Sequence, residues 1–285
     1  MSIEVVPYLP TELQDDICEL AARESHRTAA ILIQVSRSIS HRVERILYEV
    51  VIFRNHPHFF YPPHIDKWSS DIISFFQRHG HHIRYLLLDP VHPEQNIVPC
   101  LRLCPSLKGF GSLHTQHTRD VITMTQEHLP YLERLSGKLE TVFVSLDTFN
   151  STYQQLTHLD LIGDYAWDSC SIFLLQLPSL THLALNDTDM DSTLPSIKEN
   201  EMVLGSLKSC RRLEALLLVS EPFRLVEVCK VKEYEGTDIR IVAVSIKAVD
   251  DWLNGVRGGL DMWSIGDGII MERRRKQQEN REANS

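Results

Sequence analysis

Histidine is the residue type whose distribution in this chain most invites a chemical interpretation. Ten of the fourteen histidines lie between residues 56 and 128, including His56-Pro57-His58 and His79-Gly80-His81-His82. Imidazole is a common metal ligand, so a metal site is one interpretation. The six cysteines are scattered, and no two of them have the C-x-x-C spacing that places two thiolates on one ion. We therefore expect surface histidines, buried free cysteines, and no metal or other cofactor.

A second candidate for ion binding is the acidic segment 186–191, Asn-Asp-Thr-Asp-Met-Asp. It resembles the start of a calcium loop, but Ser192 stands where the sharp turn needs glycine and Lys198 stands where a bidentate glutamate belongs. The chain also lacks phosphate-binding, dinucleotide-binding, zinc-protease and nucleophile-elbow motifs. The enzyme classes with the clearest sequence motifs are thereby excluded, and the sequence favours a binding protein that is not an enzyme.

Composition narrows the kind of partner. The 285 residues are 43% hydrophobic, enough to bury a sizeable core, and 38 acidic against 29 basic side chains give a net charge of −9. An acidic balance argues against a nucleic-acid partner. No apolar run is long enough to span a membrane, and the start 1–7 has no leader features, so we expect no membrane partner and a cytoplasmic location. The basic run 273–276 leaves a nuclear location open.

A repeated apolar pattern indicates the strands on which any binding surface of this chain would be built. The frame is L-x-x-L-x-L with aliphatic replacements. Its copies start about 26 residues apart on average, which lies within the roughly 20 to 29 residues of a leucine-rich repeat. The copies are Ile83-Leu86-Leu88, Leu107-Phe110-Ser112, Leu139-Val142-Val144, Leu156-Leu159-Leu161, Leu180-Leu183-Leu185, Leu213-Leu216-Leu218 and Ile239-Val242-Val244.

The frame has a physical reason in a short strand. Residues two apart share a face, so the second and third apolar positions point into one core. One unit cannot close a core, whereas stacked units bury a continuous column. We expect an α/β fold in which 57–245 form an irregular leucine-rich-repeat solenoid with parallel strands. An ordinary α/β sheet with leucine-rich strands is the alternative, and a switched strand order with helices on both faces would indicate it.

A compact helical head over residues 1–56 precedes the repeats. Thr11 and Gln14 have the spacing of a capping box, and Leu13, Ile17 and Leu20 then share one helical face. A polar break over 23–27 separates a second apolar run, and a third helix leads to the strand-like segment 48–53. The head therefore contains three short helices, near the lower size limit for an independent core.

The head resembles an F-box over residues 7–53. The family opening LPxEL…I is matched by Leu9-Pro10-Thr11-Glu12-Leu13 and Ile17, and its V-[CS]-[RK] segment by Val35-Ser36-Arg37. Leu47-Tyr48 and Phe53 match the closing pattern, and Ile39 takes the place of the tryptophan that many F-boxes carry. The resemblance implies a substrate-recognition subunit of a cullin-RING ubiquitin ligase. Its partners would be a Skp-family adaptor with the cullin ligase core, and a protein target.

The resemblance also implies where these partners bind. It assigns the adaptor-binding surface to apolar residues of the head, namely Leu9, Pro10, Leu13, Ile17, Leu20 and Ile31. In a solenoid the residues flanking the strand leucines face the concave side, and the target would contact Tyr85, Phe143, Ser145, His158, Asp160, His182 and Asn186. The alternative function is a leucine-rich-repeat scaffold or interaction protein without a ligase role, in which the head only caps the repeats.

The C-terminal segment 246–285 is expected to form a helical cap with a basic tail. Its stretch 251–263, with two tryptophans around Gly258-Gly259, resembles the ending of many F-box-like proteins of expanded fungal families. Because solenoid ends need closing, we expect a hydrophobic cap over the last repeat. The net charge of −9 resides in residues 57–271, which favours a basic or neutral protein as the target.

Overall fold

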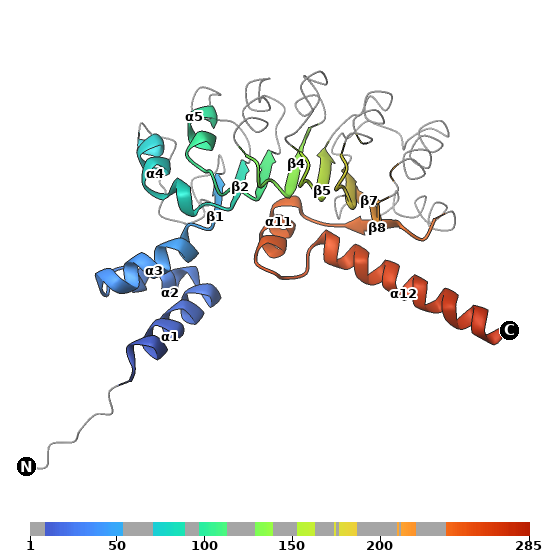
Figure 1. The fold of residues 1–285 in the computed structure, drawn as a ribbon, viewed down its shortest axis with the longest axis horizontal. Helices are drawn as coiled ribbons and strands as arrows, with labels where there is room; N and C mark the ends of the chain where they lie inside the picture. The colour runs from blue at the N-terminus through green and yellow to red at the C-terminus, as the bar shows by residue number, and fades with distance from the viewer. Residues whose placement is uncertain are drawn as a thin grey trace, which may run out of the picture.

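The computed structural model describes residues 9–53, 71–88, 97–112, 129–138, 153–162, 174, 177–186, 210, 212–220 and 238–285. Its helices are α1 (Thr11–Glu24), α2 (His26–Leu32), α3 (Arg37–Leu47), α4 (Asp71–His79), the 3-10 helix η1 (Gly80–His82), α5 (Ile97–Arg102), α11 (Ala248–Val256) and α12 (Met262–Ala283). Its strands are β1 (Val50–Phe53), β2 (Tyr85–Leu88), β3 (Gly109–Ser112), β4 (Arg134–Lys138), β5 (His158–Ile162), β6 (His182–Asn186), β7 (Ala215–Ser220) and β8 (Ile241–Ser245). The protein is therefore of the α/β class, with α1 to α3 before the sheet and α11 and α12 after it (Figure 1).

The strands form one open parallel sheet whose order follows the chain. All eight described strands are arranged β1 to β8, and each pairs in parallel with its sequence neighbour. Figure 1 shows them side by side along an arc. Because the order never switches within this sheet, the arrangement is not doubly wound.

A single apolar column runs through the sheet, and five of the seven predicted frames supply it from their second position. Leu86, Leu159 and Leu183 are at most 2% exposed, and the hydrogen-bonded register places them in line with Phe110, Leu135, Leu216 and Ile241. Helices α4 and α5 supply Phe76 and Leu101 to the same core. The period-two alternation of a strand thus puts these residues into a shared core, as the frame predicts.

One predicted frame was misplaced. The strand between β3 and β5 is Arg134–Lys138, whereas the sequence frame placed it at 139–144, which lies outside the described residues. The frame in the structure is Leu132-Leu135-Gly137, and the glycine at its third position hides it from an apolar pattern search. With this correction, the column positions from Leu86 to Leu183 are almost evenly spaced along the chain.

The last frame was shifted by one residue. The register pairs Leu216 with Ile241, so Ile241 enters the leucine column in place of the predicted Val242. Val242 and Val244 lie on the opposite face with Leu217 and belong to a separate apolar cluster. A slip of one residue moves every side chain of a strand to the other face.

The head joins the sheet directly through β1. Val50–Phe53 pair with β2, and Val51 and Phe53 are buried in the main core. The predicted capping box does not form, because α1 begins after Pro10 and no side chain caps it. The Gln14 amide instead donates a hydrogen bond to the carbonyl oxygen of Leu9, 2.6 Å away.

Helices α11 and α12 lie on the face of the sheet opposite α4 and α5 (Figure 1). Helix α12 packs onto β7 and β8, and its Trp263 lies over His158 of β5 and His182 of β6, while Trp252 of α11 reaches β3. A Cβ on Gly109 or Gly111 would meet the Trp252 ring at 3.4 to 3.5 Å. The expected cap over the last repeat is therefore corrected to a cover that extends across the sheet face.

The middle of α12 also contacts the edge of the sheet. The Arg273 guanidinium donates to the carbonyl oxygens of Ile239 and Ile241, at 3.2 and 2.6 Å. Ile241 begins β8, the last strand in the sheet order. No helix in the described parts of the chain is long and apolar enough to cross a membrane.

Candidate functional site

The head is a three-helix unit with a small apolar core. Ala22 and Ala29 are fully buried where α1 and α2 pack, and Val43 and Leu47 of α3 complete the contact. The hydroxyl of Ser36 accepts a hydrogen bond from the Ile39 backbone N–H at 3.2 Å, which satisfies a free donor at the start of α3. The core is formed mainly by α3 and the alanines, so the larger apolar residues of α1 are left for another surface.

Those larger residues are exposed to solvent. Leu13, Ile17 and Leu20 are 49%, 57% and 62% exposed on α1, and Ile31 is 59% exposed on the adjacent helix α2. Leu9 and Pro10 before α1 are exposed as well. All six residues predicted for adaptor binding are therefore accessible. Together we call them the apolar head surface.

Helix α1 turns its polar face inward, which explains this exposure. Asp15 is buried to 7% exposure and its carboxylate pairs with the Arg42 guanidinium of α3 at 3.0 Å. Glu19 pairs with Arg45 of the same helix. A helix on a globular core normally buries its apolar stripe and exposes its charges. The reversed orientation is typical of a helix whose apolar face contacts a partner.

Val35 belongs to the same exposed class but was missed as a site residue. It is 61% exposed in the turn after α2. Its position inside the Val35-Ser36-Arg37 motif was the signal that could have identified it, because the motif carried the resemblance while its side chains were given no role.

The residues predicted to face a target lie along β2, β5 and β6. Tyr85 and His158 are half-buried, whereas Asp160, His182 and Asn186 are 8%, 8% and 4% exposed. Helices α11 and α12 cover this face, so the expectation of an open surface at Asp160, His182 and Asn186 is corrected. Phe143 and Ser145 lie outside the described residues.

The repeated Leu-Thr-His-Leu sequence has a structural explanation under this cover. The Thr157 hydroxyl donates to the Glu133 carbonyl at 3.1 Å, and the Thr181 hydroxyl donates to the Thr157 carbonyl at 3.2 Å. The two following rings, His158 and His182, stack with centroids 4.4 Å apart. Each threonine thus ties its strand to the preceding one in the same way.

Trp263 of α12 covers the two stacked rings edge-on. Its centroid lies 5.1 Å from that of His158 and 5.8 Å from that of His182. Burial, with smaller contributions from His182 and Arg134, lowers the pKa of His158 to about 3. The His158 imidazole is therefore neutral at physiological pH. The neighbouring His182 contacts α12 in another way, because its Nε2 lies 3.0 Å from the Asp267 carboxylate.

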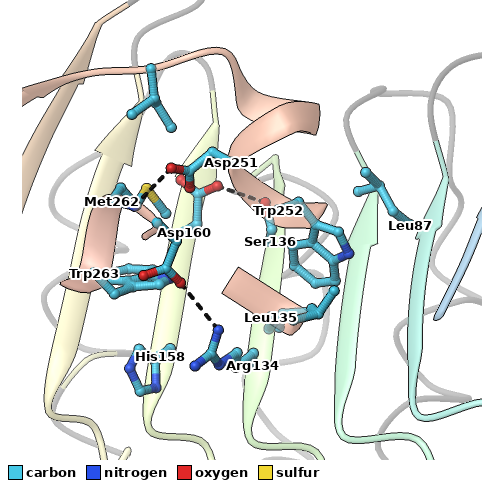
Figure 2. Close-up of a pocket in the computed structure, with 13 residues that line it drawn as sticks. Leu87, Arg134, Leu135, Ser136, His158, Asp160, Asp251, Trp252, Met262 and Trp263 are labelled. Atoms are coloured by element: carbon cyan, nitrogen blue, oxygen red, sulfur yellow. Dashed lines mark hydrogen bonds and ion pairs between the residues drawn. The ribbon is translucent and has the colours of Figure 1, made fainter. Parts of the chain in front are cut away.

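Beside the histidines lies a buried polar layer, shown in Figure 2. The Ser136 hydroxyl donates to Asp160 Oδ2 at 2.7 Å, and the Met262 backbone N–H donates to Asp251 Oδ1 at 2.7 Å. The Arg134 guanidinium pairs with Asp261 at 3.4 Å. These residues, with Trp252, line a cavity of about 30 Å³. That volume admits a water molecule but no organic substrate.

The carboxylates of this layer have shifted acidities. Burial raises the pKa of Asp160 to about 6, against the opposing hydrogen bond from Ser136. Burial also raises the pKa of Asp251 to about 7, with further increases from the charges of Asp261 and Asp160. The Asp160 Oδ1 atom is buried without a hydrogen-bond partner in the described structure.

The histidine-rich segment gives no metal centre within the part of the chain described. No group of three or more histidine, cysteine or acidic side chains there could hold an ion. His79 is buried against Tyr48, with ring centroids 3.9 Å apart, which corrects the expectation of a surface histidine. Burial lowers the pKa of His79 to about 4. Cys100 and Cys104 are buried free thiols, as expected, whereas Cys18 and Cys210 are free thiols that are only half-buried.

Docking of α12 depends on a close approach at Gly266. A Cβ there would lie 2.5 Å from Leu217 Cδ2, and Leu217 is fully buried in β7. We expect Gly266→Ala to destabilise the protein by about 1–3 kcal/mol through overpacking. The matched change Gly268→Ala meets nothing within 4 Å and should stabilise α12 by about 0.5–1 kcal/mol. Thermal unfolding measures both, and equal shifts would contradict the packing described.

Comparison of the sequence with protein-family models and with curated proteins finds no match. The class of protein is therefore defined by its own fold and surfaces. It is an α/β protein with an open parallel sheet, a helical head with an exposed apolar surface, and a C-terminal helix pair covering one sheet face. The particular role that these surfaces support follows from the head.

Proposed function

We propose that the protein is the substrate-recognition subunit of a Skp-cullin-F-box ubiquitin ligase, with the apolar head surface binding a Skp-family adaptor. The observation that carries this proposal is the orientation of α1. Its carboxylates face α3, while Leu13, Ile17 and Leu20 face solvent. In the protein alone this orientation leaves apolar side chains in water, which is unfavourable. An apolar surface on a partner would bury these side chains.

The body supports the second half of the proposal, that leucine-rich repeats present a target-binding surface. The strands stack in chain order, and the register advances along the chain in almost equal steps from β2 to β6. Such stacking is the geometry of a solenoid. The protein would recruit a target without catalytic residues of its own, in the cytoplasm or the nucleus.

Charge and shape favour a protein as the target. The part of the sheet face left accessible includes the half-buried Tyr85, beside Arg84, Lys108 and Glu133 at the strand starts. Arg84 pairs with Glu49 and Lys108 with Glu133, so neighbouring strands neutralise one another along this rim. A mixed aromatic and neutralised surface suits a protein better than a phosphate backbone.

Adaptor binding is tested with purified full-length protein and a Skp-family adaptor. We expect the wild type to form a stable complex, and Ile17→Asp to weaken it at least about 30-fold because a charge would enter a buried apolar contact. The control Leu260→Asp places the same charge at a residue that is 75% exposed outside the head, and should bind normally. Calorimetry gives the affinities, and circular dichroism verifies that both variants are folded.

A folded wild-type protein that binds no Skp-family adaptor would refute the ligase proposal. It would leave the scaffold function, which the contact between head and body favours. Tyr48 at the end of α3 packs edge-on against Phe75 of α4, with centroids 5.6 Å apart, and β1 belongs to the sheet. In a scaffold these contacts would make the head a cap of the repeats, and Ile17→Asp would change no measured interaction.

A further inference from the structure

The contact between the C-terminal helices and the sheet is unusually acidic. Asp160 lies on β5, Asp251 on α11, and Asp261 immediately before α12. All three are at most 8% exposed and line the same small cavity. Buried carboxylates normally have cationic partners, because desolvation penalises an isolated charge. Negative charge at this buried interface is unfavourable unless a cation or a proton balances it.

Only one of the three carboxylates is balanced by a cation among the described residues. Asp261 pairs with Arg134 of β4 and also accepts hydrogen bonds from the backbone N–H and hydroxyl of Ser264, at 2.8 and 2.6 Å. Within the same part of the chain, Asp160 and Asp251 form no ion pair. Figure 2 shows Asp160 of the sheet and Asp251 of α11 at this contact, where both line the same cavity.

In each of these two carboxylates, one oxygen accepts a hydrogen bond from a neighbouring residue and the other oxygen does not. Asp160 Oδ2 accepts from Ser136, and its Oδ1 is buried without a partner in the described structure. Asp251 Oδ1 accepts from the Met262 backbone, which leaves Oδ2 outside that hydrogen bond. Two ionised carboxylates that line one small cavity repel one another, and a proton on either of them removes that repulsion.

No other charged group in the described structure forms an ion pair with either carboxylate, although the charge of Arg134 partly opposes the raised pKa of Asp251. On β4, Arg134 is engaged with Asp261, and on β5 the His158 ring is neutral. On β6, His182 faces Asp267 of α12. Asp250, the neighbour of Asp251 on α11, is exposed and is itself an acidic residue.

We propose that Asp160 and Asp251 share one proton, and that this proton clamps α11 and α12 onto the sheet, so that the C-terminal cover loosens as the pH rises through neutrality. In the closed state the protonated carboxyl donates a hydrogen bond to its ionised neighbour. Loss of the proton leaves two anions lining the same cavity and favours release of both helices of the cover. Release would uncover Asp160 and His182 along the sheet.

The direction of the pH effect on closure follows from the pKa values of the two carboxyl groups. Both carboxyl groups have raised pKa values in the closed state, about 6 and about 7, against an ordinary value of 3.8. Closure therefore binds a proton, and its stabilisation is complete below pH 3.8 and is lost as the pH rises through the range of 6 to 7. For one shared proton, the closing equilibrium weakens by about 100-fold between pH 5 and pH 8.

Hydrogen exchange on the full-length protein tests the clamp. Local opening constants for α11 and the first turns of α12, corrected for intrinsic exchange, are measured from pH 5 to pH 8, with the β5 and β6 amides as an internal reference. We expect opening of the helices to rise about 10- to 100-fold with pH, while the strands change little.

Two variants and one control identify the groups responsible. Asp160→Asn and Asp251→Asn each replace the shared proton by a permanent amide donor, so each should abolish the pH response and keep the cover closed. Asp250→Asn removes an adjacent exposed charge and should retain the response. A wild-type response that is absent, that spreads equally to the strands, or that survives both asparagine variants would overturn the proposal. The inference concerns the body alone, so it stands or fails independently of adaptor binding by the head.

Discussion

Leu159→Ala should lower the free energy of unfolding by about 2–5 kcal/mol. Leu159 is fully buried at the centre of the leucine column, where its strand neighbours in register are Leu135 and Leu183. Truncating the side chain loses the transfer free energy of the removed carbons and leaves a cavity that two flanking strands cannot close without shifting the register. Urea unfolding monitored by far-ultraviolet circular dichroism gives the value.

The matched control is Leu260→Ala. Leu260 is 75% exposed in the segment between α11 and α12, so the same truncation should change stability by less than about 0.5 kcal/mol. Comparable losses for the two variants would show that Leu159 lies outside a continuous core. A large loss for Leu159 alone supports stacking of the strands around one column.

Gly80→Ala should destabilise the protein by about 1–3 kcal/mol or more. Gly80 begins η1 and is buried against the end of α5, and an added Cβ would overlap the carbonyl oxygen of Leu103. A backbone atom cannot rotate away as a side chain can, so η1 and α5 must separate. The shift would be transmitted to Leu101 and Cys104, both fully buried in the main core.

Gly137→Ala provides a control at another glycine of the sheet. Its Cβ would lie 3.4 Å from the Ser112 carbonyl oxygen, an ordinary contact distance, so we expect a stability change of less than about 1 kcal/mol. Thermal melting of both variants distinguishes steric overlap from a general cost of replacing glycine. If Gly137→Ala were the more damaging change, the packing of η1 on α5 would be wrong.

The sheet could be predicted wherever one face carries leucine and the other carries polar residues. Leu159 and Leu161 alternate with His158 and Asp160, and that contrast marks the strand and its register. In β8 the contrast disappears, because α12 covers the second face and the sequence Ile-Val-Ala-Val is apolar on both sides. Strands buried on both faces lose the alternating pattern. The one-residue error at Ile241 follows from this.

The head surface was predicted from motif residues, but its physical basis was not. The pairing of Asp15 with Arg42 joins two different helices, and no periodicity within α1 indicates which of its faces points inward. The cover over Asp160 was missed for a similar reason. Trp252 and Met262 come from the C-terminal helices, far downstream in the chain, and polar side chains on a strand were taken to indicate solvent where they indicate a second polar layer.

The contact of Arg273 with β8 limits growth of the sheet. The carbonyl of Arg240 accepts from Leu216 of β7, so the carbonyls of Ile239 and Ile241 point away from the sheet, where the N–H groups of an added strand would bind. The guanidinium occupies both of these acceptors. An open edge is a template for strand addition and aggregation. Arg273, near the middle of α12, thus blocks the edge of the sheet and makes strand addition from a second molecule unfavourable at the start of β8.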